Sequence, residues 1–527
     1  MLDLTQPKLL NQTSLPFNDA RTCKDWLNTL PLTDAGRAHR MVTEIIDSMN
    51  LTEMHGFERL KMMELMRDKV AFLQDQVAHA FVGKPVPLPP AAWETWQRAS
   101  ELWQGMEQGY RYCLLAAANG DADTAKHAAL IVQRCLRYSG LQVAHHGLSY
   151  SAVPSRLMED LHHLYVYADQ RGVAHVQVKD SLDGHRGVTT AAQAYVRALL
   201  VEAADIGNLT SQELVAIDSL LKKWAGKVVI SRIPPEGAPG TLRCADLSGD
   251  KGLRAPAGKP TQRDGLIYLD LHAISDSLRR RMRKLSAGVP WSDLRLPSAF
   301  ASVSAAALMA HAYRRWCEPD AEMPLAAPAR DKCEVVSGFD AYYQVLTGKP
   351  FEAPRQSDDL GQLEAQQMAV FGKVTSRAAS AIVVDPTEHW KLEGASAIRL
   401  RMRRPVASHI SMSLQQLIGY RGAAMADFGL AIVRGLSDHG SSGLVVDAEV
   451  VVGQLEAIIF RTKDAVFQPA LRLIQGDGQG PVNFIVSPGP MASGKIVEVR
   501  TQGIQMYRLT GLVRRGVNFE WVTGEPL

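Results

Sequence analysis

The spacing of apolar residues in this chain changes near residue 227, and that change constrains the fold more than any other feature. Before it, apolar residues recur every three or four positions, as on one face of a helix. After it, short apolar runs alternate with Pro and Gly, a pattern typical of strands joined by turns. No single structural class satisfies both patterns. We therefore expect an α+β chain with several domains.

The first 226 residues are predicted to be helical. One apolar run from Asp34 to Phe81 ends at the Pro-rich segment 84–90, because clustered prolines remove backbone donors. Further helices are expected at 93–114, 122–138, 191–204 and 213–224. Thr210 and Glu213 have the spacing of a capping box that starts the last of these. The pattern predicts an interaction domain of helical hairpins, with a tetratricopeptide-like solenoid as an open alternative.

Beyond residue 226 the pattern predicts a mixed α/β region over 227–365 and β-structure after it. The mixed region has a strand at 266–271, an arginine-rich helix, a helix at 298–316 and a strand at 332–336. From Ala381 onward the chain is nearly all short strands, the first at 382–384. Such spacing favours a small antiparallel barrel. We assign it to 366–465, and a β-rich extension or second small barrel to 466–527.

Composition narrows the function classes. The formal charge is +3 over 527 residues, which gives no general case for nucleic acid or for an anionic membrane. The six cysteines form no CxxC pair and are expected to be reduced thiols. The first residues lack a signal-like apolar core, and the longest weakly polar stretch, 299–312, is too short to span a bilayer. A soluble, cytoplasmic protein is expected.

The motifs that carry known chemistry are weak. Gly489 to Lys495 fits GxxxxGK, but Ile496 stands where a P-loop needs a hydroxyl, and the next residues alternate like a strand. The pairs His145–His146 and His162–His163 lie in helical segments, where neighbouring side chains point about 100° apart. Each pair can therefore supply one metal ligand easily, and no further ligand motif joins them. We predict no enzyme, cofactor or metal site, with a histidine-containing enzyme site as the alternative.

Residues 279–284 hold five cations in six positions. This run could bind nucleic acid, but no aromatic residues interleave with the charges, so a solvated helix face is favoured. Nucleic acid is not expected as a partner.

The segments His389–Leu400 and Leu430–Leu436 resemble the strand-and-turn core of PilZ barrels. A wider resemblance is to large proteobacterial proteins that combine a helical N-terminal region with a PilZ-type C-terminal barrel. The family resemblance implies a bacterial sensor of cyclic di-GMP, in which an RxxxR segment and a D/N-x-S-x-x-G turn contact the ligand. The counterparts here are Lys373–Arg377 and Gly394–Arg399. Arg377 and Ser396 match that pattern, whereas Lys373, Gly394 and Arg399 depart from it.

Arg399, Arg401 and Arg403 alternate along one predicted strand, which places them on one face. That face could bind an anionic second messenger or be the charged outside of a barrel. The candidate contacts for cyclic di-GMP are Lys373, Arg377, Ser396, Arg399, Arg401 and Arg403. We expect a non-catalytic signalling protein that couples cyclic di-GMP to a protein partner through its helical half. A scaffold without ligand, acting only through protein contacts, remains the alternative.

Overall fold

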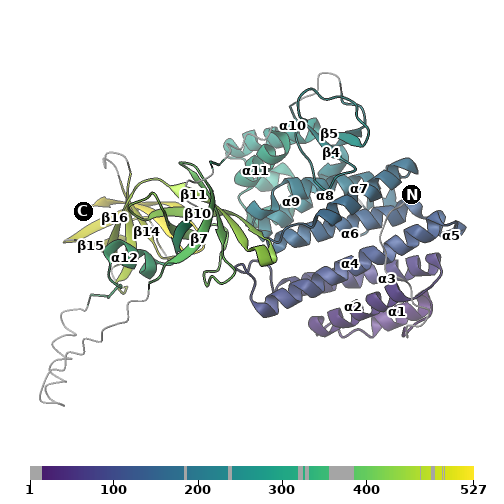
Figure 1. Ribbon diagram of the computed structural model, residues 1–527, viewed down its shortest axis with the longest axis horizontal. Coiled ribbons are helices and arrows are strands. Elements are labelled where there is room, and N and C mark those ends of the chain that lie inside the picture. The colour runs from purple at the N-terminus through teal and green to yellow at the C-terminus, as the bar shows by residue number, and fades with distance from the viewer. Residues whose placement is uncertain are drawn as a thin grey trace, which may run out of the picture. The chain divides into compact units, whose positions relative to one another are not determined.

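The chain divides into two units, Met1–Met323 and Pro324–Leu527. Helices build most of the first unit. The computed structural model describes residues 15–182, 187–235, 240–318, 325–326, 332–354, 385–462, 465–475, 481–489, 491, 493–501 and 503–527. The first unit has helices α1 (Ala20–Asn28), α2 (Ala35–Leu51), α3 (Gly56–Ala78), α4 (Pro90–Ala118), α5 (Ala122–Ala125), α6 (Ala128–Leu148), α7 (Ser155–Gln170), α8 (Ala191–Ala203), α9 (Ser211–Trp224), α10 (His272–Ser286) and α11 (Ala305–Cys317). Helix α6 packs between α4 and α8 (Figure 1).

The helical prediction is confirmed for this unit, with two differences in detail. The helix expected over 122–138 is divided into α5 and α6, because the Asp121 carboxylate binds the N–H groups of Asp123 and Thr124 and holds a separate turn. The helix expected from 298 begins as the 3₁₀ helix η4 (Ser298–Ser302), and α11 starts only after the cap at Ser304. Within the described residues, no helix has the length and apolarity that a membrane crossing requires.

The capping box that begins α9 is also confirmed. The Thr210 hydroxyl oxygen accepts from the Glu213 N–H at 3.3 Å, and the Glu213 carboxylate accepts from the Thr210 N–H at 2.9 Å. Thr210→Ala should lower the free energy of unfolding by about 1 kcal/mol, because the Glu213 N–H at the helix start loses its acceptor. Thr210→Ser, which keeps the hydroxyl, should stay close to the wild type. Thermal unfolding of both variants checks this, and equal losses would contradict it.

The mixed region adds a small antiparallel sheet to the helical unit. Its strands are β3 (Val229–Ser231), β4 (Leu242–Asp246) and β5 (Leu266–Asp270), in the order β3-β5-β4. A short hairpin, β1 (Val178–Lys179) with β2 (Val188–Thr189), joins α7 to α8. The other 3₁₀ helices of this unit are η1 (Ile206–Asn208), η2 (Ala225–Lys227) and η3 (Trp291–Leu294).

The described residues of the second unit form two closed antiparallel barrels and one α-helix, as Figure 1 shows. The first barrel, in the order β10-β11-β8-β7-β6-β9, has strands β6 (Lys332–Val336), β7 (Glu388–Ala395), β8 (Arg399–Arg404), β9 (Leu417–Gly422), β10 (Gly429–Asp438) and β11 (Leu444–Val451). The second, in the order β12-β13-β14-β17-β16-β15, has β12 (Gln454–Thr462), β13 (Gln468–Ile474), β14 (Val482–Val486), β15 (Ile496–Arg500), β16 (Ile504–Arg515) and β17 (Glu520–Pro526). The unit also contains α12 (Phe339–Thr347) and η5 (Gly440–Ser442).

Strand β6 belongs to the first barrel. It lies within the range 227–365, for which the sequence predicts a separate mixed region. Sequence spacing cannot reveal this pairing, because β6 pairs with β7 across a long stretch of chain. The strand expected at 382–384 lies outside the described residues. The α+β architecture with C-terminal antiparallel barrels is confirmed, and the tetratricopeptide-like repeat stays a prediction.

An apolar core and paired hydrogen bonds join the two barrels. Tyr342, Leu471 and Phe519 belong to one buried cluster that includes residues of both barrels and of α12. The Asn518 side chain accepts from the Leu417 N–H at 2.8 Å and donates to the Leu417 carbonyl at 3.0 Å. The barrels therefore share a packed interface within their unit.

Candidate functional site

The predicted ligand contacts are partly within the described structure. Lys373 and Arg377 lie outside the described residues. Ser396 lies in the turn between β7 and β8, where its hydroxyl oxygen accepts from the N–H of Arg399 at 3.0 Å. Its own N–H donates to the Arg399 carbonyl at 2.8 Å. Ser396 therefore closes the turn that positions the arginine strand.

The arginine strand follows the predicted alternation. Arg399, Arg401 and Arg403 lie on the outer side of β8, whereas Leu400 and Met402 are buried. Arg401 forms two bonds with the Asp447 carboxylate, at 2.9 and 2.8 Å. Arg403 contacts the Glu393 carboxylate at 2.5 Å and the Ser442 carbonyl at 2.9 Å. The guanidinium groups of Arg401 and Arg403 thus have carboxylates of the same barrel as their counter-ions.

Arg404, the next cation, is buried and shapes a loop. Its guanidinium donates to the carbonyls of Ile410 at 2.6 Å and Ser408 at 2.7 Å. Glu388 accepts from the N–H groups of His409 and Ile410 in the same loop. Burial lowers the pKa of Arg404, although Glu388 opposes that change. Arg404 therefore organises the loop after β8.

The structure adds a polar cluster at the junction of the barrels that sequence reasoning missed. Arg434 of β10 and Arg514 of β16 both donate to the Gln415 side-chain carbonyl, at 3.2 and 2.8 Å. Both also contact the Glu449 carboxylate of β11. The sequence gives little indication of this cluster, because Arg434 and Arg514 each occur in a short motif that is not repeated nearby. Only the strand register brings them together.

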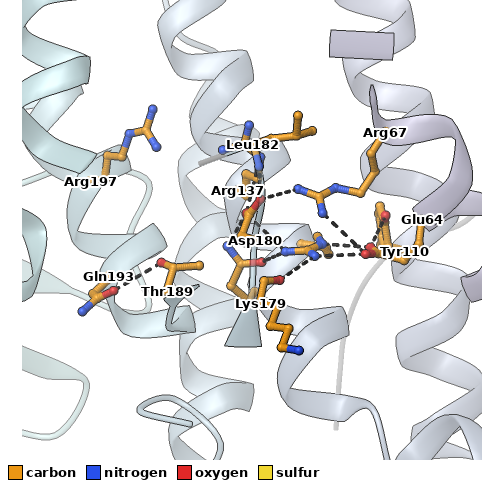
Figure 2. A network of polar contacts seen from close by, with 12 residues as sticks. Glu64, Arg67, Tyr110, Arg137, Lys179, Asp180, Leu182, Thr189, Gln193 and Arg197 are labelled. Atoms are coloured by element: carbon orange, nitrogen blue, oxygen red, sulfur yellow. Dashed lines mark hydrogen bonds and ion pairs between the residues drawn. The ribbon is translucent and has the colours of Figure 1, made fainter. Parts of the chain in front are cut away.

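The helical unit holds a buried network of arginines and carboxylates (Figure 2). Arg67 of α3 contacts the Asp180 carboxylate at 2.7 Å, and Arg134 of α6 contacts it at 3.2 Å. Arg137 lies 4.0 Å from the same carboxylate, and Arg134 also contacts Glu64 at 2.8 Å. Burial acts to raise the pKa of Asp180, but the three arginines outweigh it and hold that pKa below its ordinary value. This network anchors the hairpin segment to the helices.

Three of the four paired histidines, His145, His146 and His162, are buried in the core. The His145 ring stacks on Trp96 with centroids 5.1 Å apart, and its Nε2 lies 3.0 Å from the Trp96 carbonyl oxygen. His162 lies within hydrogen-bonding distance of the Tyr195 hydroxyl and the Lys251 carbonyl. His163 is exposed. Across the part of the chain that the structure describes, no three His, Cys, Asp or Glu residues are grouped to hold a metal.

Burial gives these histidines a testable pH dependence. It lowers the pKa of His145 and of His146 to about 4 from an ordinary value of 6.5. Between pH 4 and pH 6.5 the unfolded chain therefore binds more protons than the folded chain. The contribution of these histidines to the free energy of unfolding is complete above pH 6.5 and falls as the pH drops towards 4. We expect a loss of up to about 1.4 kcal/mol per pH unit for each histidine. Unfolding of wild type and His146→Gln at pH 7 and 5 checks this, since the variant should lose less.

The basic run on α10 is partly used for packing. Arg279 donates to the Tyr313 hydroxyl at 2.7 Å, and the Arg281 guanidinium lies 5.0 Å from the Trp224 ring centre. Two of its five cations thus contact α11 and α9. These contacts give Arg279 and Arg281 a role in packing, and the solvated helix face expected from the sequence stays a prediction for the run.

A polar hollow of about 160 Å³ lies near the end of α8. Its lining includes the carboxylates of Glu202 and Asp205 and the guanidinium of Arg315, which is 3.4 Å from Asp205. Burial raises the pKa of Glu202 to about 7. Ligand pockets usually measure about 300–1,000 Å³. The hollow is therefore small for a dinucleotide.

Comparisons with known proteins find similarity in the helical unit. Residues 21–236 match the family model described as the N-terminal domain of the cyclic-di-GMP receptor FimW. The cyclic-di-GMP receptor FimW of Pseudomonas aeruginosa is 26% identical over 217 residues, which are 41% of this chain and 36% of that protein. The match thus spans about a third of the relative's length. No solved structure matches this chain. Over residues 21–236, the chain is similar to the N-terminal domain of a cyclic-di-GMP receptor.

Proposed function

We propose that this chain is a non-catalytic bacterial receptor for cyclic di-GMP. The observation that carries the proposal is the similarity of residues 21–236 to the N-terminal domain of a cyclic-di-GMP receptor. The resemblance of the first barrel to PilZ domains points independently to the same ligand. The two signals come from different units of the chain. Their agreement favours a receptor over a scaffold without ligand.

The first barrel is the proposed place of binding. Arg399, Arg401 and Arg403 share the outer side of β8. Guanidinium groups match phosphate oxygens in two parallel bonds and stack on purine faces, which are the two surfaces that cyclic di-GMP offers. Lys373 and Arg377, which precede β7 in the chain, would supply the RxxxR-like contact. Ser396 would act by fixing the turn that begins β8.

We propose that the helical unit passes the signal on by binding a protein partner. A ligand changes the activity of a receptor only if it binds one conformation better than another. In this proposal, cyclic di-GMP on the barrel favours one conformation of the chain, and a protein partner recognises the helical unit in that conformation. A scaffold that has lost its ligand would bind the partner whether or not cyclic di-GMP is present.

Titration with cyclic di-GMP tests the proposal, and Arg401→Ala should weaken binding by about 10- to 100-fold. The variant removes a charge-assisted contact worth about 1.5–3 kcal/mol, and it also leaves Asp447 to repel the phosphates. Isothermal calorimetry of both proteins at one fixed salt concentration measures the change.

The control is Arg472→Ala, which removes an arginine of the second barrel that contacts Glu456 at 3.5 Å. Its affinity should equal that of the wild type. Wild-type protein that neither binds nor is thermally stabilised at high cyclic di-GMP would reject the receptor proposal. The scaffold without ligand would then become the better description.

A further inference from the structure

Two arginines from different barrels converge on the same pair of acceptors. The Gln415 side-chain oxygen lies 3.2 Å from Nη1 of Arg434 and 2.8 Å from Nη2 of Arg514. The Glu449 carboxylate lies 2.6 Å from Nε of Arg434 and 3.5 Å from Nη1 of Arg514. We name Arg434, Arg514, Gln415 and Glu449 the junction cluster. Its two guanidinium groups are held close together although they carry the same charge.

Local irregularities of the backbone orient the side chains of the junction cluster. Arg434 is the extra residue of a β-bulge in the pairing of β10 with β11. A second bulge, at Val513, directly precedes Arg514 in the pairing of β16 with β17. Gln415 has a φ of 62°, in the left-handed region that few residues other than glycine adopt. Bulges and such strained residues are common next to binding sites, where they redirect side chains.

The junction cluster has more positive than negative charge. Glu449 is its one carboxylate, and Arg399 of the neighbouring strand β8 is the cross-strand partner of Glu449. Burial lowers the pKa of Arg514, and the nearby charge of Arg434 lowers it further. The side chains of Arg434 and Glu449 are 41% and 44% exposed, so an anion in solution can reach them. An anionic ligand would relieve the repulsion between the guanidinium groups.

The junction cluster also continues the arginine face. Strands β8, β11 and β10 are neighbours in the first barrel, and they carry Arg399, Glu449 and Arg434 respectively. Arg514 extends this row onto the second barrel. We infer that Arg434 and Arg514 bind a phosphate group of cyclic di-GMP, with Gln415 holding both guanidinium groups in position and Glu449 as the counter-ion that the phosphate displaces. This inference rests on the proposed receptor function.

A phosphate held in this way would connect the two barrels. Each guanidinium can offer two parallel N–H bonds to phosphate oxygens, and the two forks come from different barrels. Binding would thus add contacts across the barrel interface. Glu449 would lose its bonds to the arginines as the phosphate takes them.

Substitutions that keep side-chain size test the inference. Arg434→Gln and Arg514→Gln should each weaken cyclic di-GMP binding by about tenfold or more in calorimetry with the full chain. Glu449→Gln should strengthen binding several-fold, because it removes the carboxylate that competes with the phosphate. A purely structural ion-pair cluster predicts a lower melting temperature for Glu449→Gln without any gain in affinity. A gain in affinity cannot come from misfolding.

The second barrel offers a matched control. Arg461 and Arg500 share the Glu498 carboxylate, at 2.8 and 2.6 Å, so this cluster has the same composition of charges. Glu498→Gln should leave the affinity unchanged. Suppose that wild type binds cyclic di-GMP and that Arg401→Ala weakens this binding. If Arg434→Gln and Arg514→Gln both bind like the wild type, or if Glu449→Gln does, the inference is overturned and the receptor function stands. If wild type does not bind cyclic di-GMP, both are overturned.

Discussion

Replacing Asp180 with alanine should lower the free energy of unfolding of the helical unit by about 3–5 kcal/mol. The Asp180 carboxylate is fully buried and lies against Arg67, Arg134 and Arg137. Without it, three buried guanidinium groups are left with Glu64 as the remaining carboxylate of the network in Figure 2. Uncompensated buried charge is among the most expensive defects in a folded protein.

Calorimetric unfolding measures this loss without assuming a two-state transition, since the chain has two units. Asp180→Asn should also be strongly destabilised, because it keeps the shape but loses the charge. The Asp180 pKa is held below its ordinary value of 3.8. The contribution of Asp180 to stability is therefore present above that pH and is lost as the pH falls through the lower pKa of the folded state.

The control is Glu94→Ala, which removes an exposed partner of Arg98 and should change the stability little. A mild effect of Asp180→Ala would show that the arginines find other partners.

Trp390→Ala should destabilise the barrel unit by about 3–5 kcal/mol, the usual loss for a buried tryptophan. Trp390 is 2% exposed on the inner side of β7, and its cross-strand partner is Cys333 of β6. Its indole N–H donates to Glu388 at 3.0 Å, and Glu388 binds the loop after β8. Truncation would therefore leave a cavity and also loosen the loop that Arg404 organises.

His389→Ala is the matched control for Trp390→Ala, because His389 precedes Trp390 on the same strand but is exposed. Its melting temperature should stay close to that of the wild type. Chemical unfolding followed by tryptophan fluorescence is unsuited to Trp390→Ala, since the variant removes a reporter, so calorimetry is used for both. Equal losses in the two variants would contradict the contribution to stability that we expect from the buried Trp390.

Sequence periodicity was enough to predict the class of each half of the chain. The helix that begins at Thr210 follows from a local capping box and an apolar face, both of which are set by residues close in sequence. The alternation of Arg399, Arg401 and Arg403 likewise follows from strand geometry alone. Local patterns of this kind specify elements and their exposed faces. They do not specify which distant element becomes a neighbour.

The sequence by itself therefore determined the helical and β-rich halves, the turn at Ser396 and the outward arginine face of β8. Only the tertiary structure decided that β6 completes the first barrel, that Asp180 lies against three helix arginines, and that Arg434 and Arg514 share the Gln415 side chain. The physical reason is that these contacts join residues far apart in the chain. Their geometry depends on strand register, on bulges and on how whole elements pack, and no local pattern in the sequence records those variables.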